Sequence, residues 1–249
     1  MASAGLTHEE IEHWNAHGYV VVRGALEPRD LAPMVADYEA IVERRAQQLL
    51  AAGRISDTHA GEPFDARFAK ICEEDSEFSP SHLDEFLDIG HGAARGETRG
   101  TFELMRCPNL MAIVEPILGS PEVAWSPISH VRAKLPAAIS PASNVAGWHQ
   151  DAIFVTEDAD DVFVLTVWLA VTEATVEMGC LEIMPGVQTE RTVFWSGPGG
   201  PGMGGNLPQQ RPTVHEPVSP GDVILLHKVR GTPPAVGSGR NAGDARDAL

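Results

Sequence analysis

The second half of the chain is built of short apolar runs, and this pattern limits the possible folds more than any other feature. From about residue 121 onward, runs rich in Val, Ile and Leu are separated by Gly, Pro, Asp or Asn. The runs are EVAWSPISHVRAKL, GWHQDAIFV, DVFVLTVWLAV, GCLEIMPGV and TVHEPVSPGDVILLH. Short strands at regular spacing are typical of a β-sandwich or barrel, whereas a βαβ fold needs a helix between successive strands. We therefore predict a mainly β core over residues 121–229.

The first 120 residues are predicted to be mostly helical. Thr7 and Glu10 have the spacing of a capping box at the start of a helix, and Gly18 is placed to end that helix. The β-branched stretch YVVVRGAL that follows predicts a short strand.

Two more helices are predicted from apolar residues at helical spacing, one over 28–52 and one over 108–119, and Gly119 is placed to end the second. The segment between them, 53–100, is polar and mixed. We expect it to be a variable cover over the core, with a short helix at SHLDEFLDI (81–89).

Charge and composition exclude several kinds of partner. The chain has 18 basic and 35 acidic residues, which gives a net charge of −17. Such a surface repels phosphate backbones and anionic membranes, so neither nucleic acid nor membrane is an expected partner. The longest apolar run, 162–171, is too short to span a bilayer. No secretory signal is expected, because the first residues do not form a basic region followed by an apolar core. We predict a cytoplasmic protein, and the sequence does not indicate its oligomeric state.

The three cysteines do not form a recognisable framework. Cys72, Cys107 and Cys180 are far apart, and none belongs to a CxxC pair. This spacing does not support a disulfide framework or a zinc ribbon. We expect buried structural thiols in a reducing compartment.

Two polar side chains interrupt the apolar run VAGWHQDAIFV. If this run is a strand, His149 and Asp151 project from the same face with Cα atoms roughly 6–7 Å apart, and Gln150 faces the opposite side. Imidazole and carboxylate belong to the 2-His-1-carboxylate set that binds Fe(II) and leaves positions open. The alternative is a buried His–Asp hydrogen bond. A second histidine, His227, ends the later run GDVILLH.

The order of motifs along the chain carries a family resemblance. The motifs are LTHEEIEHWNAHGYVVVRGAL, GWHQD, TVWLAVTEATVEMGCLEIMPGV and SPGDVILLH. Together they resemble the phytanoyl-CoA dioxygenase family of Fe(II)/2-oxoglutarate-dependent oxygenases. The resemblance implies a double-stranded β-helix (a jelly roll, cupin-like) with helices packed outside it. It also implies iron bound by His149 and Asp151, Trp168 near the co-substrate, and oxidative decarboxylation of 2-oxoglutarate coupled to hydroxylation of a small organic substrate.

The end of the chain departs from the family pattern. The family's last iron ligand lies in a string like His-x4-His-Gly-Ser/Thr, whereas this chain has LLHKVRGTPP. Counting back from GTPP puts Arg230 at the ligand position, and counting forward from His227 puts Thr232 there. A guanidinium has no lone pair to donate to a metal. The third ligand is therefore either His227 or absent, while Thr232 and Arg240 match the hydroxyl and the arginine that hold 2-oxoglutarate.

The tail over 230–249 is poor in aliphatic residues and is predicted to be irregular. We expect one dioxygenase-like domain over 1–249, with its closing strands missing because the C-terminus is truncated or shifted out of its ancestral reading frame. The Gly/Pro-rich stretch at 196–212 lacks the Lys-Ser/Thr ending of a P-loop and is expected to be a flexible loop or a lid.

Two functions from different classes follow from these patterns. The first is an iron-dependent dioxygenase, with activity intact or impaired by loss of the distal histidine. The second is a catalytically inactive jelly-roll protein, ligand-binding or vestigial. A zinc or manganese cupin would need a further Glu or His, which HQDAIF does not offer, and no GxSxG supports a hydrolase. For His130 and Lys134, ordinary structural roles are favoured over a place in the cavity.

Overall fold

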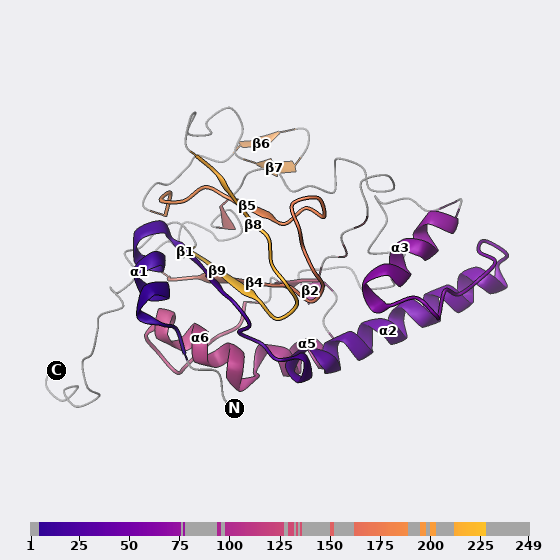
Figure 1. Cartoon of the computed structure of the whole chain (residues 1–249), viewed down its shortest axis with the longest axis horizontal. Coiled ribbons are helices and arrows are strands. Elements are labelled where there is room, and N and C mark those ends of the chain that lie inside the picture. The colour runs from indigo at the N-terminus through magenta and orange to yellow at the C-terminus, as the bar shows by residue number, and fades with distance from the viewer. Residues whose placement is uncertain are drawn as a thin grey trace, which may run out of the picture.

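The computed structural model describes the chain in segments that cover both halves of the sequence. These are residues 5–75, 77, 94–95, 98–126, 129–131, 133, 135, 150–151, 162–188, 195–197, 200–202 and 212–227. The described helices are α1 (His8–His17), α2 (Pro28–Ala51), α3 (Phe64–Glu74), α5 (Arg99–Met105) and α6 (Pro108–Leu118). The described strands are β1 (Tyr19–Val22), β2 (Ala94–Arg95), β3 (Ser129–His130), β4 (Leu165–Leu169), β5 (Leu181–Ile183), β6 (Trp195–Gly197), β7 (Gly200–Gly202), β8 (Val214–Glu216) and β9 (Val223–His227) (Figure 1).

The predicted helix ends are confirmed where local signals set them. The Glu10 backbone N–H donates to Thr7 Oγ1 at 3.2 Å, and the Thr7 backbone N–H donates to Glu10 Oε2 at 2.7 Å, which completes the capping box of α1. Gly18 and Gly119 end α1 and α6 in the left-handed conformation, with φ of 75° and 67°. Glycine adopts this conformation without the steric penalty that a Cβ would bring.

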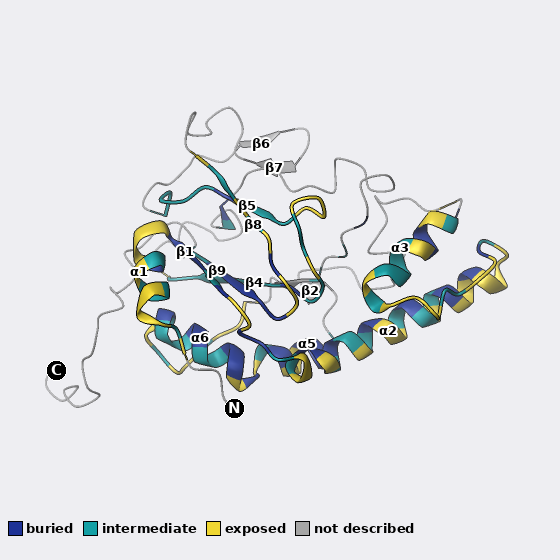
Figure 2. Ribbon diagram, viewed as in Figure 1, coloured by how far each residue is buried: buried dark blue, intermediate teal, exposed yellow. Residues whose placement is uncertain are grey.

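A three-stranded antiparallel sheet in the order β1-β9-β4 joins the two ends of the described chain. Val22 of β1 and Leu169 of β4 both pair with Val223, so β9 is the central strand. Val223, Ile224 and Leu225 are fully buried, and Figure 2 shows this strand in the colour of buried residues. A separate antiparallel pair, β5-β8, lies on one side of this sheet, and α6 lies on the other (Figure 1).

The two faces of the sheet bury different sets of side chains. One face packs against α1, α2 and α6 in what we call the helix-side cluster, which contains Trp14, Val20, Val22, Leu31, Leu110, Ile113, Val223 and Leu225, with Leu165, Val167 and Leu169 packed against it. The other face packs towards β5 and β8 in the strand-side cluster, which contains Tyr19, Ala170, Ile183, Val218 and Ile224, with Trp168 and Leu226 packed against it. Successive residues of β4 and β9 therefore alternate between the two clusters, as strand geometry requires.

The turn that leads into β9 is fixed to the end of β1 by a buried carboxylate. Asp222 accepts hydrogen bonds from the backbone N–H groups of Gly24 (2.7 Å) and Ser219 (2.9 Å), and from Arg23 Nη1 (3.0 Å). Burial acts to raise the pKa of Asp222, but these hydrogen bonds outweigh it and hold the pKa below its ordinary value. The SPGD sequence thus sets where β9 begins.

The structure corrects the expectation of a mainly β protein. Among the described residues, more lie in helices than in strands, and each described α-helix lies between His8 and Leu118. The helices α3 and α5, in and next to the segment predicted to be a polar cover, were not predicted. Ile71 and Cys72 of α3 are buried in a small cluster with Val42 and Leu49 of α2. A narrow apolar stripe on α3 is enough to form this cluster.

The remaining fold predictions have mixed outcomes. The strands predicted within 161–171, 179–187 and 213–227 are confirmed as β4, β5, β8 and β9, although each is shorter than its apolar run. Part of the segment 196–212, which was predicted to be a loop, belongs to the two-stranded antiparallel pair β6-β7. The helix predicted at 81–89 and the tail at 230–249 lie outside the described residues. None of the described helices is long and apolar enough to span a bilayer.

Candidate metal and co-substrate site

The carboxylate of Asp151 is held against the strand-side face of β4. Asp151 Oδ2 accepts a hydrogen bond from Thr166 Oγ1 at 2.5 Å, and both side chains are partly buried. Leu165 and Val167 pack on the helix-side cluster, so Thr166 between them points to the opposite face, which it shares with Trp168. The structure therefore places Asp151 beside the face that carries the family tryptophan.

The backbone at Asp151 differs from the sequence prediction. We expected a strand, but Asp151 lies in a 3₁₀ turn, and Gln150 before it is buried with 7% of its surface exposed. His149 lies outside the described residues. The prediction that His149 and Asp151 share one face of a strand is therefore not met at Asp151, and the convergence of their side chains stays a prediction.

His227 lies on the other face of the sheet. Its ring packs against Phe163 and Trp14, with ring centroids 5.2 Å and 5.9 Å away, and both aromatic residues belong to the helix side. The strand alternation agrees, because His227 comes two residues after Leu225, which is buried in the helix-side cluster. The structure does not bring His227 and Asp151 together, and it gives no support to His227 as the third metal ligand.

Trp168 lies on the same face as the Asp151–Thr166 pair, two residues along β4. Its indole packs against the strand-side cluster, where it pairs across the sheet with Ile224. The structure thus shows a packing role for Trp168. A contact with 2-oxoglutarate stays a prediction.

The roles of the other predicted site residues stay predictions. Thr232, Arg240, Arg230 and Lys134 lie outside the described residues. For His130 the structure describes only its backbone, in β3, where it pairs with Arg95 in parallel register.

Sequence reasoning missed Thr166. It is the only polar residue in the apolar run VFVLTVWLAV, and it has the same strand parity as Trp168. A hydroxyl on an apolar, partly buried face needs a hydrogen-bond partner. The pattern could therefore have indicated a polar neighbour on this face, but not that the neighbour is Asp151.

A second polar contact on the strand-side face holds Tyr19 in place. Its hydroxyl donates to Glu216 Oε1 at 2.8 Å. Burial, followed by the hydrogen bond to Glu216, raises the pKa of Tyr19 to about 12. The phenol therefore stays protonated and acts as a donor that ties β1 to β8.

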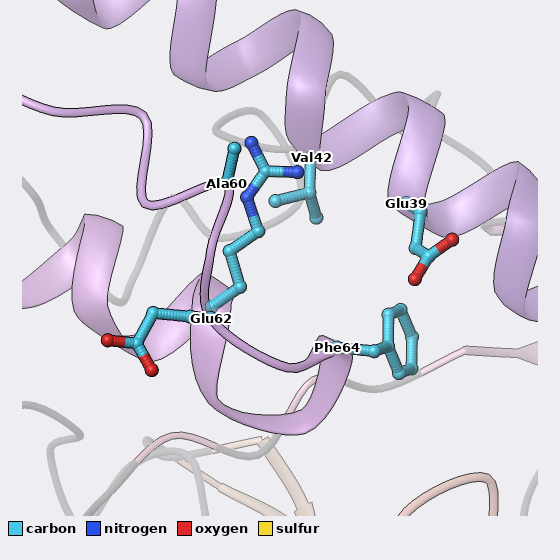
Figure 3. A pocket seen from close by; sticks show the side chains of 6 residues that line it. Glu39, Val42, Ala60, Glu62 and Phe64 are labelled. Carbon is cyan, nitrogen blue, oxygen red and sulfur yellow. The ribbon is translucent and has the colours of Figure 1, made fainter.

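A small hollow lies between α2 and α3 (Figure 3). Glu39, Val42, Ala60, Glu62, Phe64 and Arg67 line it. Its volume of about 70 Å³ is far below the several hundred Å³ of pockets that hold organic ligands. Arg67 is also engaged with Glu43 and with the carbonyl oxygen of Thr58. The hollow is therefore not a candidate substrate site.

Asp151 is the described residue that suits an iron centre. Carboxylate oxygens are ligands that Fe(II) accepts, and one oxygen of Asp151 accepts the hydrogen bond from Thr166. Among the described residues, no cluster of three or more His, Cys, Asp or Glu side chains could hold a metal ion. The described part of the chain thus contains one of the residues predicted to bind iron, Asp151, and the second, His149, lies outside it.

The described architecture, an antiparallel sheet with helices on one face and a partly buried carboxylate on the other, is compatible with the jelly roll that the sequence resemblance implies. The sequence profile of the family Phytanoyl-CoA dioxygenase (PhyH) matches residues 14–229. The chain belongs to this family, whose members are in general Fe(II)/2-oxoglutarate-dependent dioxygenases.

The matched region runs from α1 to just beyond β9. It includes His149, Asp151, Trp168 and His227, whereas Thr232 and Arg240 lie beyond it. No curated protein matches the chain.

Proposed function

We propose that this chain is an Fe(II)- and 2-oxoglutarate-dependent dioxygenase that hydroxylates a small organic substrate, with His149 and Asp151 as its protein metal ligands. The observation that carries the proposal is the hydrogen bond that holds Asp151 on the Trp168 face of β4. The family match supports the two cofactors.

In this proposal each described residue has a limited role. Asp151 supplies the negative charge that favours a divalent cation, and Thr166 holds its carboxylate. Trp168, on the same face of β4 as Thr166, is proposed to form an apolar wall of the site that limits the access of water. When bound, Fe(II) and 2-oxoglutarate would supply the oxygen activation that C–H hydroxylation needs. Thr232 and Arg240 are proposed to hold the co-substrate carboxylate.

A second candidate is a catalytically inactive member of the family that binds a small ligand in the same place. The position of His227 favours this alternative, because its ring packs on the helix side and away from Asp151. Arg230, at the family ligand position, cannot replace it. An iron centre of the facial type would then have two of its three protein ligands.

The expected partners and location are also proposals. The acidic composition supports a small-molecule substrate rather than nucleic acid or a membrane surface, and we propose a cytoplasmic location.

Turnover of 2-oxoglutarate distinguishes the two functions. Purified protein is supplied with Fe(II), ascorbate, oxygen and 2-oxoglutarate, and succinate is quantified with and without candidate substrates. Oxygenase function predicts succinate formation that is lost in His149→Ala and Asp151→Ala and retained in Asp65→Ala, an exposed carboxylate on α3. No succinate from the wild-type chain, together with gain of turnover in Arg230→His, would instead support the inactive alternative.

A further inference from the structure

We infer that Thr166 is a positioning residue for the metal-binding carboxylate of Asp151, an inference that rests on the proposed function. The geometry points to Thr166 because its hydroxyl contacts Asp151 directly, at 2.5 Å, from a different segment of the chain. Nothing in the family resemblance or in the sequence pattern assigned a role to this residue.

Packing alone does not explain why residue 166 is a threonine, because burying its hydroxyl costs free energy unless the hydroxyl is hydrogen-bonded. Valine has the same shape and favours strands equally well, and the neighbouring positions in LTVWL are apolar. A hydroxyl on a partly buried face is favourable only when it is hydrogen-bonded. In Thr166 that bond is made to the one carboxylate in the HQD motif.

The strand makes Thr166 a rigid donor. Thr166 pairs with Leu226 of β9, the central strand of the sheet, and Val167 beside it pairs with Leu225, which is fully buried. A β-branched side chain has few allowed χ1 rotamers, so the backbone of the strand restricts where Oγ1 of Thr166 can lie. Asp151, in contrast, lies in a 3₁₀ turn outside the sheet. The hydrogen bond therefore links the carboxylate of Asp151 to the sheet and restricts its position.

This arrangement has a direct consequence for metal binding. A hydrogen bond to one carboxylate oxygen restricts rotation about the Cβ–Cγ bond, so fewer orientations must be given up when a cation binds. Partners that orient a ligating carboxylate typically change metal affinity by about 10–100-fold when removed. A purely structural link between the turn and β4 would change stability and leave the affinity for metal unaltered.

The test measures the affinity of the full-length chain for Co(II) alone, by calorimetric and absorption titration without oxygen or 2-oxoglutarate. Thr166→Val removes the hydroxyl and keeps the shape, and we expect the dissociation constant to rise about tenfold. Thr166→Ser restores the hydroxyl, and we expect a value within about twofold of the wild type. The melting midpoint of each metal-free variant is recorded separately.

Thr213→Val is the matched control. Thr213 Oγ1 donates to Glu182 Oε1 at 2.6 Å, a more exposed threonine–carboxylate hydrogen bond between the residue before β8 and the middle of β5. Its loss should leave the Co(II) affinity unchanged. If Thr166→Val fails to fold, Thr166→Ala is measured in its place and judged by the same criterion.

The outcomes separate this inference from the proposed function. Wild-type binding with an equal affinity in Thr166→Val, or with no recovery in Thr166→Ser, overturns the positioning role and leaves the proposed function standing. An equal loss in Thr213→Val also overturns it, because the effect would then be general. A wild-type chain that binds no divalent metal overturns the proposed function and this inference together.

Discussion

The carboxylate of Asp151 and the imidazole of His227 lie on opposite faces of the β1-β9-β4 sheet. Asp151 is bonded to Thr166 on the strand side, and the His227 ring packs against Trp14 and Phe163 on the helix side. Because a sheet separates its two faces completely, both groups cannot reach one ion unless the end of β9 refolds. A metal ion bound by Asp151 would therefore lie on the strand-side face, away from His227.

The first prediction concerns His227. His227→Leu places an apolar side chain of similar volume between Trp14 and Phe163, so we expect the free energy of unfolding to change by no more than about 1 kcal/mol. Metal affinity, measured by Co(II) titration, should stay within about twofold of the wild type, whereas Asp151→Asn should lose binding. If His227→Leu loses the metal as fully as Asp151→Asn does, the ring is a ligand and its position in the structure is not the metal-bound one.

The second prediction concerns the turn before β9. Gly221 has a φ of 91°, and a Cβ there would collide with the carbonyl oxygen of Leu26. Gly221→Ala should therefore lower the free energy of unfolding by about 3 kcal/mol or more, through backbone strain plus the collision. Urea denaturation measures this loss.

Gly179→Ala is the control for that substitution. Gly179 has a similar φ of 80°, but no heavy atom lies within 4 Å of the position that an alanine methyl group would occupy. The cost should be the left-handed strain alone, about 1 kcal/mol. Equal losses at the two glycines would show that the contact with Leu26 does not matter.

The third prediction concerns acid stability. Glu74 accepts hydrogen bonds from the Ser56 backbone at 2.5 Å and contacts His59 Nε2 at 2.7 Å. Hydrogen bonds from Ser56, followed by that from His59, lower the pKa of Glu74 to about 2. A depressed pKa adds stability that is complete above the unfolded-state value of 4.5 and is lost as the pH falls towards 2.

Melting midpoints of the wild type and Glu74→Gln should thus differ at neutral pH and converge between about pH 4.5 and 2. Glu73→Gln, the neighbouring and more exposed position on α3, should shift the midpoint much less. A difference between wild type and Glu74→Gln that persists unchanged down to pH 2 would contradict the account of this hydrogen-bonded cluster.

Local signals made the helix ends predictable. Thr7 with Glu10, and the glycines at 18 and 119, act through contacts within a few residues of the chain. The helix α3 was missed because its buried residues, Ile71 and Cys72, form a narrow stripe whose partner is α2, distant in sequence. To recognise such a stripe as buried, one must know which helix packs against it, and the spacing of apolar residues in the sequence does not give that.

The face of His227 could not be predicted for a different reason. The strand VILLH is central in its sheet and apolar on both faces, so alternation gives no sign of which residues meet the helices. Only the pairing of β9 with β1 and β4 decides which face of the sheet His227 lies on. In contrast, the HQD motif indicated that Asp151 needs a polar partner, because a carboxylate in an apolar run is costly without one, and Thr166 is such a partner in the structure.

The most direct test of the proposed metal site is an anaerobic Fe(II) titration of the wild-type chain, His149→Ala and Asp151→Ala, with Asp65→Ala as control. The proposal predicts one Fe(II) bound per wild-type and Asp65→Ala chain, and none by either site variant. Fe(II) binding that survives both substitutions, or a folded wild-type chain that binds none, would contradict it.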